Sequence, residues 1–310
     1  MRIAFFGTPH FGLPCLEMLV QSHHEIVGVF CQPDRKSGRG HKIIFPPIKQ
    51  CAIENDLPVF QYEKIKSAEA IEELKDINFD LMITAAYGQI LSAEILDIPK
   101  SGCINVHASL LPKYRGAAPI QWVIMNGEQT TGITTMFTDI GLDTGDMLLK
   151  DETSIGDDET GGQLYERLSI LGATTLKRTL DALEKSELIP EKQLESESSY
   201  YPLLKKEMAK LSFELTAKQL VDKVRALDPV IKCYARYKGN DIKLLKLKVI
   251  DTEIIGKAGE VLISNHKDGL VIMSADKAIE VIDIQAPGSK RMRAKDYLLG
   301  KQIPVGDIFE

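Results

Sequence analysis

The sequence predicts an α/β protein with two domains, a larger N-terminal domain on a mostly parallel sheet and a smaller C-terminal domain of short strands. The chain has 310 residues, which is more than a single hydrophobic core usually contains. Its beginning follows the order strand, helix, strand, which is typical of a βαβ unit in a parallel sheet. Roughly the last hundred residues contain short strand-like runs between turns, as small barrels and sandwiches do.

The βαβ unit comes first along the chain. Residues 2–6 and 25–31 are apolar runs that predict buried strands, and residues 13–21 have helical spacing between them. The turn over residues 7–12 has Pro9 where a dinucleotide-binding fingerprint needs its second glycine. The turn therefore does not indicate a dinucleotide site. It remains either a tight connection or a loop beside a ligand at the strand ends.

A long loop follows the second strand, over residues 32–47, where about two to six residues are usual. It carries four basic side chains among glycines, inside an otherwise acidic half of the chain. Such a cluster is often only a solvated surface loop. The isolation and length of this one favour contact with phosphate groups. Its basic residues are Arg35, Lys36, Arg39 and Lys42.

The remaining elements of the first domain alternate in the same way. Helices are expected over residues 46–55, 68–76, 119–127 and 159–185. Strands are expected over residues 79–86, 131–138 and 147–150. The last helix carries a leucine stripe that predicts a buried face: Leu164, Leu168, Leu171, Leu176, Leu180 and Leu183.

A polar segment with proline near both ends, residues 189–204, is typical of a linker. It divides the chain into a domain over residues 1–188 and a domain over residues 205–310. In the second domain, helices are expected over residues 215–227 and 294–300. The strands are expected over residues 232–238, 242–251, 258–264, 269–273 and 279–285.

Composition narrows the class of protein. The net charge is −6, but residues 205–310 hold 20 Lys and Arg against 15 Asp and Glu, so the rest of the chain carries −11. A basic C-terminal part is compatible with a polyanionic partner. No apolar run reaches the roughly 18 residues of a membrane span, and the N-terminus lacks the zones of a signal peptide, so we expect a cytoplasmic protein. Five dispersed cysteines indicate neither disulfides nor a zinc site.

The residues that suggest chemistry gather in one stretch, residues 103–119. Asn105 and His107 are two positions apart at the end of a strand-like run, so they project from the same face. Asp143 lies in a glycine-flanked loop further on. An amide, an imidazole and a carboxylate at the loop ends of a parallel sheet suit acyl transfer to an amine. No G-x-S-x-G elbow occurs, and the apolar neighbours of Cys103 favour an inert thiol.

These motifs resemble the folate-dependent formyltransferases. The resemblance is carried by N-V-H-A-S-L-L-P-K-Y-R-G-A-A-P-I-Q at 105–121 and by D-I-G-L-D-T-G-D at 139–146. The opening G-T-P-x-F at 7–11, the loop Q-P-D-R-K-S-G-R-G at 32–40 and A-Y-G-Q-I-L at 86–91 extend it over essentially the whole chain. The basic loop is similar to that of the members that act on methionyl-tRNA, and relatives that formylate small metabolites lack it.

The resemblance implies a Rossmann-like formyltransferase domain linked to an OB-like β-barrel domain that contacts tRNA. It implies 10-formyltetrahydrofolate as formyl donor, no metal, and the α-amino group of initiator methionyl-tRNA as acceptor in translation initiation. We expect a monomer. Asn105, His107 and Asp143 match the catalytic residues of the family, and the basic loop residues, Arg39 above all, match its tRNA contacts. The expected folate contacts are Ser109, Leu110, Leu111, Pro112, Tyr87, Gly88, Gln89, Ile90 and Leu91.

Other interpretations of the sequence remain open. One is a formyltransferase of the same fold that acts on a small amine, or a formyltetrahydrofolate hydrolase. Another is a non-catalytic RNA-binding protein, which the intact catalytic set disfavours. The sequence departs from the family at His10, where an acidic residue is usual, and at residues 227–233, where a tryptophan motif is usual.

Overall fold

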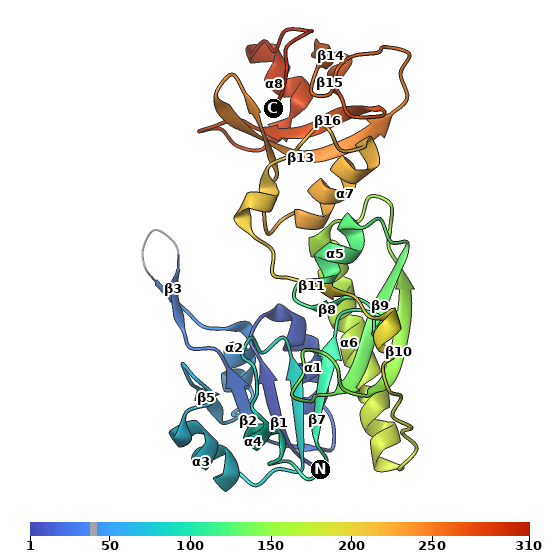
Figure 1. The fold of residues 1–310 in the computed structure, drawn as a ribbon. Helices are drawn as coiled ribbons and strands as arrows, with labels where there is room; N and C mark the ends of the chain where they lie inside the picture. The colour runs from blue at the N-terminus through green and yellow to red at the C-terminus, as the bar shows by residue number, and fades with distance from the viewer. Residues whose placement is uncertain (38–41) are drawn as a thin grey trace. The chain divides into compact units, whose positions relative to one another are not determined.

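The computed structural model describes residues 1–37 and 42–310, and the chain forms two compact units (Figure 1). The first unit, which holds most of the N-terminal part, contains Met1–Pro119, Thr130–Thr153 and Tyr165–Tyr201. The second unit contains the C-terminal part and two short inserts, Ile120–Gln129, Ser154–Leu164 and Pro202–Glu310. In the part of the chain that is described, no helix is both long and apolar enough to cross a membrane.

The first unit is built on a seven-stranded sheet with the order β10-β9-β7-β6-β1-β2-β5. Strands β5, β2, β1, β6 and β7 are parallel, and β9 is antiparallel to β7. The prediction of a mostly parallel sheet is therefore confirmed. The strands are β1 Arg2–Gly7, β2 Glu25–Cys31, β5 Val59–Gln61, β6 Leu81–Ala85, β7 Cys103–His107, β9 Thr130–Phe137 and β10 Met147–Ser154.

All five residues of β6 are buried, which explains why its sequence is a continuous apolar run. The helices of this part of the chain are α1 Leu13–Val20, α2 Pro47–Glu54, α3 Ala68–Asp76, α4 Ala93–Leu96, α5 Pro119–Met125 and α6 Gly161–Glu184. From Ile120 onward α5 belongs to the second unit, as does the beginning of α6 up to Leu164. Helix α3 begins where the sequence predicts it, because the Ser67 side chain accepts a hydrogen bond from the Ala70 N–H. In α6, four leucines of the predicted stripe are buried and Leu171 and Leu183 are half-buried.

The basic loop is more regular than its sequence indicates. β3 (Arg35–Ser37) and β4 (Lys42–Ile44) pair as an antiparallel ribbon that extends away from the main sheet (Figure 1). We call residues 35–44 the basic ribbon; residues 38–41 of it lie outside the described residues. The prediction of a loop was wrong at Arg35–Ser37 and Lys42–Ile44, where cross-strand pairing satisfies backbone groups that a long loop leaves open.

The polar segment after α6 lies against the first unit along much of its length. Glu191 and Met147 exchange two backbone hydrogen bonds of 2.8 Å. β11 (Tyr200–Tyr201) pairs in parallel with β8 (Arg115–Gly116), and a 3-10 turn over Glu195–Glu197 lies between these contacts. We call residues 191–201 the strap. The strap brings a distant part of the sequence to the end of the stretch that contains Asn105 and His107.

The second unit is an OB-like domain with a curled antiparallel sheet of the order β12-β13-β16-β15-β14, and β17 pairs with β16. Its elements are α7 Ala217–Leu227, β12 Tyr234–Tyr237, β13 Asn240–Ile250, β14 Val261–Asn265, β15 Gly269–Met273, β16 Ala278–Gln285, β17 Met292–Arg293 and α8 Ala294–Gly300. A capping box between Thr216 and Gln219 begins α7. Leu227 and Cys233, at the ends of the segment that lacks the tryptophan motif, are buried in the core of this unit.

Candidate active site

Asn105 lies on β7, beside the buried strand β6. Its partner in the register is Thr84, and the Thr84 hydroxyl donates a hydrogen bond of 2.8 Å to the Asn105 Oδ1 atom. This contact fixes the amide, because the oxygen side is taken. The amide nitrogen makes no hydrogen bond to any residue that the structure describes. Asn105 therefore presents two N–H donors that a developing oxyanion can use.

His107 ends β7 and is 6% exposed. Its Nε2 atom lies 2.9 Å from the carbonyl oxygen of Tyr114, which can only accept, so Nε2 carries the hydrogen. The other ring nitrogen, Nδ1, is then the atom that can take up a proton. It faces Asp143, with 3.7 Å between Nδ1 and Oδ1. The main-chain carbonyl orients the ring, and the carboxylate faces the atom that gains charge.

Asp143 lies in the loop between β9 and β10, in a left-handed backbone conformation with φ of 55°. Its Oδ2 atom accepts a hydrogen bond of 2.8 Å from the Gly116 N–H. Gly145 is required nearby, because a Cβ there would lie 1.8 Å from the carbonyl oxygen of Phe137. The structure thus brings together His107 and Asp143 from separate elements and places Asn105 two residues from His107 on one strand.

Two further residues reach this site, and neither was assigned a role from the sequence. The Gln193 Nε2 atom donates to the carbonyl oxygens of Asp143 and Gly145, each at 2.8 Å. Arg115 donates from Nε to the Gln193 Oε1 atom at 2.9 Å and forms an ion pair of 2.8 Å with Glu195. Arg115 was visible inside the motif, but no spacing signal marks Gln193 in a segment that reads as a linker.

The predicted folate-contacting turn, residues 109–112, is held by hydrogen bonds to Lys113 and to Thr134 of β9. The Ser109 hydroxyl is fully buried and donates to the carbonyl oxygen of Lys113 at 2.7 Å. Thr134 accepts from the Leu111 N–H and donates to the Ser109 carbonyl. Leu111 and Pro112 are buried, and Leu110 is half-buried. Leu110 is thus the side chain of this turn best placed to meet a ligand.

The second predicted folate segment, residues 87–91, follows β6 at the same edge of the sheet. Thr8 donates from its hydroxyl to the carbonyl oxygen of Tyr87 at 2.8 Å, which joins this segment to the end of β1. Gln89 is occupied by main-chain groups of Tyr62 and Ile65. Tyr87 and Leu91 are buried, Gly88 has φ of 88°, and Ile90 is 69% exposed. The residues that follow β1 and β6 are therefore joined by a hydrogen bond at one edge of the sheet, and we call this edge the border.

The basic ribbon is separate from these contacts. Arg35 is exposed and lies 3.2 Å from Glu63, also exposed. Lys36 and Lys42 lie on the paired strands β3 and β4, and Arg39 lies outside the described residues. The ribbon is anchored at its base by Lys49, which binds Asp34 at 2.6 Å and lies 4.2 Å from the centre of the Phe45 ring.

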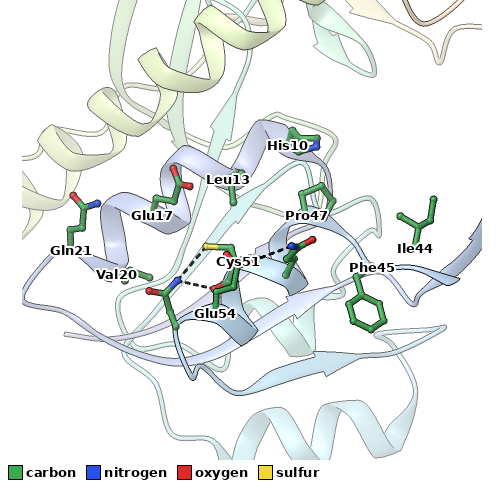
Figure 2. Close-up of a pocket in the computed structure, with 12 residues that line it drawn as sticks. His10, Leu13, Glu17, Val20, Gln21, Ile44, Phe45, Pro47, Cys51 and Glu54 are labelled. Carbon is green, nitrogen blue, oxygen red and sulfur yellow. Dashed lines mark hydrogen bonds between the residues drawn. The ribbon is translucent and has the colours of Figure 1, made fainter.

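A cavity of about 630 Å³ lies between α1, α2 and the residues after β4 (Figure 2). Its wall includes His10, Glu17, Ile44, Phe45 and Pro47, and none of the three predicted catalytic residues lines it. His10, at which the sequence departs from the family, therefore opens onto this cavity. The strand ends with Asn105 and His107 remain the better candidate for chemistry, because the required functional groups meet there.

Cys103 shares the strand face of Asn105 but is 2% exposed. Burial raises the pKa of its thiol to about 12. A thiol is a poor nucleophile when its pKa is so far above neutrality. Cys103 is therefore a poor candidate for a nucleophile in this structure.

Comparison with known proteins identifies the family of the chain. A family model described as formyl transferase matches residues 1–180, and one described as formyl transferase, C-terminal domain, matches residues 203–302. The methionyl-tRNA formyltransferase of Alkaliphilus oremlandii (strain OhILAs) is 45% identical over 308 residues, which are 99% of each chain. These matches cover both units of the chain.

Solved structures share the fold at lower identity. The N-formyltransferase of Helicobacter canadensis, in complex with folinic acid and dTDP-3-aminofucose, has a TM-score of 0.67 and 20% identity and covers 92% of this chain and 98% of its own. HypX from Aquifex aeolicus, in complex with tetrahydrofolic acid, has a TM-score of 0.62 and 16% identity; 99% of this chain matches half of that longer protein. The chain therefore belongs to the formyl transferase family, and its full-length relatives carry the name methionyl-tRNA formyltransferase.

Proposed function

We propose that this chain transfers the formyl group of 10-formyltetrahydrofolate to the α-amino group of initiator methionyl-tRNA. The observation that carries the proposal is the meeting of an amide, an imidazole and a carboxylate at one strand end, in a chain that resembles methionyl-tRNA formyltransferases along its full length. The products are N-formylmethionyl-tRNA, which serves translation initiation, and tetrahydrofolate.

The proposed reaction is direct attack. The neutral α-amino nitrogen attacks the formyl carbon, a new C–N bond forms, and the formyl oxygen becomes an oxyanion that the Asn105 amide N–H groups stabilise. His107 takes the proton from the attacking nitrogen at Nδ1. The C–N10 bond then breaks, and the proton passes to N10 of the departing folate.

The proposed role of Asp143 follows from its position. Because Nε2 of His107 is held by the Tyr114 carbonyl, Asp143 is not needed to orient the ring. Its carboxylate faces Nδ1 at 3.7 Å, the atom that becomes protonated. Asp143 could either orient the ring or relay a proton, and this geometry favours stabilising the imidazolium and relaying its proton.

For the substrates we propose two separate surfaces. The folate lies against the border formed by residues 87–91 and 109–112, where Leu110 and Ile90 offer part-exposed apolar surface. The tRNA contacts are Arg35, Lys36, Arg39 and Lys42 of the basic ribbon and the basic residues beyond residue 205. We further propose a monomer that acts in the cytoplasm, with the domain limits 1–188 and 205–310; size-exclusion chromatography with light scattering tests the monomer.

The decisive experiment uses 10-formyltetrahydrofolate with a labelled formyl group. The purified protein is incubated with initiator and elongator methionyl-tRNA side by side, and label on the amino group is measured after mild deacylation. We expect label on the initiator species. Free labelled formate without transfer indicates a hydrolase, label on an added amino sugar indicates a small-amine transferase, and tight tRNA binding without turnover indicates an RNA-binding protein.

A further inference from the structure

The strap, residues 191–201, contacts two segments of the proposed site. One is residues 114–117, which include the carbonyl that binds His107, and the other is the loop that carries Asp143. Arg115 and Ala117 donate backbone hydrogen bonds to the carbonyl oxygens of Ser199 and Tyr201, at 2.8 and 3.0 Å. The Ser199 hydroxyl accepts a hydrogen bond from the Tyr114 N–H at 2.9 Å. Tyr114 is the residue whose carbonyl holds His107. Ser199 of the strap therefore binds the N–H of the same residue whose carbonyl oxygen orients the His107 ring.

Gln193 extends the strap to the other loop. Its amide nitrogen has two hydrogens, and both are used, one for the carbonyl oxygen of Asp143 and one for that of Gly145. Its amide oxygen accepts from the Nε atom of Arg115. A primary amide is the side-chain group suited to this position, because two donors must face one loop while an acceptor faces a cation.

The Asp143 loop is held from within by Asp139, whose Oδ1 atom accepts hydrogen bonds from the Gly141 N–H and the Thr144 hydroxyl, and Gln193 adds a hold from outside. Asp143 has φ of 55°, a conformation that residues other than glycine adopt at a cost. The chain on either side contains Gly141 and Gly145, which allow many alternative backbone conformations. Among the residues that the structure describes, the carboxylate accepts one hydrogen bond, at Oδ2 from the Gly116 N–H, and its Oδ1 atom lies 3.7 Å from Nδ1 of His107. The main chain of the loop is where rigidity has to be supplied.

Arg115 makes Gln193 a fixed rather than a mobile support. Its side chain is 7% exposed, and its guanidinium is shared between Gln193 and Glu195. The Arg115 guanidinium is buried, so if it lost its hydrogen bond to Gln193, part of its polar surface would be left without a partner and the folded state would lose stability. The hydrogen bond from Arg115 to Glu195 holds the pKa of the Glu195 carboxyl below its usual range. The chain of contacts therefore runs from Glu195 through Arg115 and Gln193 to Asp143.

We propose that Gln193 is a positioning residue of the formyl transfer reaction. By binding the carbonyl groups of Asp143 and Gly145, it holds the Asp143 carboxylate against Nδ1 of His107, and Arg115 holds Gln193. This inference rests on the proposed function, because it assigns a role toward the proposed catalytic carboxylate. A purely structural role, in which Gln193 only fastens the strap, predicts different results in the experiments below.

The first experiment compares Gln193→Met, which keeps length and shape but cannot donate two hydrogen bonds, with Lys192→Met, an exposed neighbour in the strap. We expect Gln193→Met to lower kcat at least tenfold, with KM for folate and for methionyl-tRNA within twofold of wild type. Lys192→Met should leave all three unchanged. Gln193→Glu can still pair with Arg115 but presents a carboxylate to two carbonyls, so it should be as impaired as Gln193→Met.

The second experiment is a double-mutant cycle with Asp143→Ala. If Gln193 acts through Asp143, Gln193→Met should lower kcat by less than twofold in the Asp143→Ala background. Equal fold losses in both backgrounds, or a loss of kcat in proportion to the unfolded fraction measured by circular dichroism, would overturn the inference. A rise confined to KM for tRNA would also overturn it, since that places the strap in substrate binding.

A measurement without turnover separates this inference from the proposed function. With ¹⁵N-labelled histidine, the side-chain signals of His107 report the carboxylate facing its ring. In Gln193→Met they should move toward their position in Asp143→Ala, and in Lys192→Met they should not move. Wild-type protein that is folded but transfers no formyl group contradicts the proposed function alone. Unmoved His107 signals in Gln193→Met contradict the positioning role alone.

Discussion

The proposed catalytic groups and the basic ribbon are held in different ways. The Tyr114 carbonyl binds His107, the Gly116 N–H donates to the Asp143 carboxylate, and Gln193 of the strap donates to the Asp143 carbonyl oxygen. Residues 114–116 and the strap are far apart in sequence. The ribbon strands β3 and β4 pair with each other in a sheet of two strands. Groups fixed by several distant segments are preorganised for a reaction. We therefore expect substitutions at the catalytic groups to alter kcat, and substitutions in the ribbon to alter the use of tRNA.

The largest effects are expected at the strand end. Asn105→Ala removes the oxyanion donors and should lower kcat by roughly 10²–10³-fold, and His107→Ala should lower it by about 10²–10⁴-fold. Formyl transfer to methionyl-tRNA measures this. Binding of methionyl-tRNA in a filter assay should stay as in wild type, and its loss in parallel would mean that these residues shape the tRNA surface instead.

The Asp143 loop should be sensitive to a single methyl group. In Gly145→Ala the new Cβ would lie 1.8 Å from the Phe137 carbonyl oxygen, so the loop must move. We expect kcat to fall at least tenfold and the free energy of unfolding to fall by about 1–3 kcal/mol. Gly300→Ala is the matched control, because its Cβ would meet nothing within 4 Å. Normal kcat in Gly145→Ala would show that the loop position is not critical.

A smaller and different effect is expected in the basic ribbon. Arg39→Ala should raise KM for methionyl-tRNA several-fold while kcat at saturating tRNA stays near that of wild type. The slope of log K against log salt should fall by about 0.7–0.9 if one phosphate contact is lost. Lys185→Ala, at the residue that follows α6, serves as a charge-matched control. An unchanged salt slope in Arg39→Ala would exclude phosphate contact at this position.

The smallest effect is expected for Asp34, at the base of the ribbon, where a substitution should change the free energy of unfolding and not the activity. Burial acts to raise the pKa of Asp34, but hydrogen bonds from Lys49 and Gln61 outweigh it and hold this pKa below its usual range. A lowered pKa means that the stabilisation is complete above about pH 4 and is lost as pH falls through the lowered value. Asp34→Asn should therefore cost roughly 1 kcal/mol in urea unfolding at pH 7, after allowance for partial exposure.

The same Asp34→Asn variant should have unchanged kcat, which sharpens the contrast with Gly145→Ala. The stability difference from wild type should persist between pH 5 and pH 8. It should shrink only at lower pH, where Asp34 of the wild type becomes protonated. A difference that grows as pH falls would contradict the sign of the pKa shift.

Much of the fold follows from local patterns. Ser67 begins α3, the Thr216 and Gln219 capping box begins α7, and the fully buried β6 is a continuous apolar run. Each is decided by neighbours within a few residues, so the sequence is sufficient to predict it. The ribbon was predicted as a loop, because the pairing of β3 with β4 depends on two strands of only three residues each. Three residues are too few to show a periodic pattern.

For the candidate site, the sequence by itself determined which functional groups are present: an amide and an imidazole two residues apart, and a carboxylate between glycines. Strand periodicity places Asn105 and His107 on one face without further information. Only the tertiary structure decided that the Tyr114 carbonyl orients His107, that Asp143 faces Nδ1, and that Gln193 holds the Asp143 loop. These contacts join residues up to 50 positions apart, and no local pattern encodes such a distance.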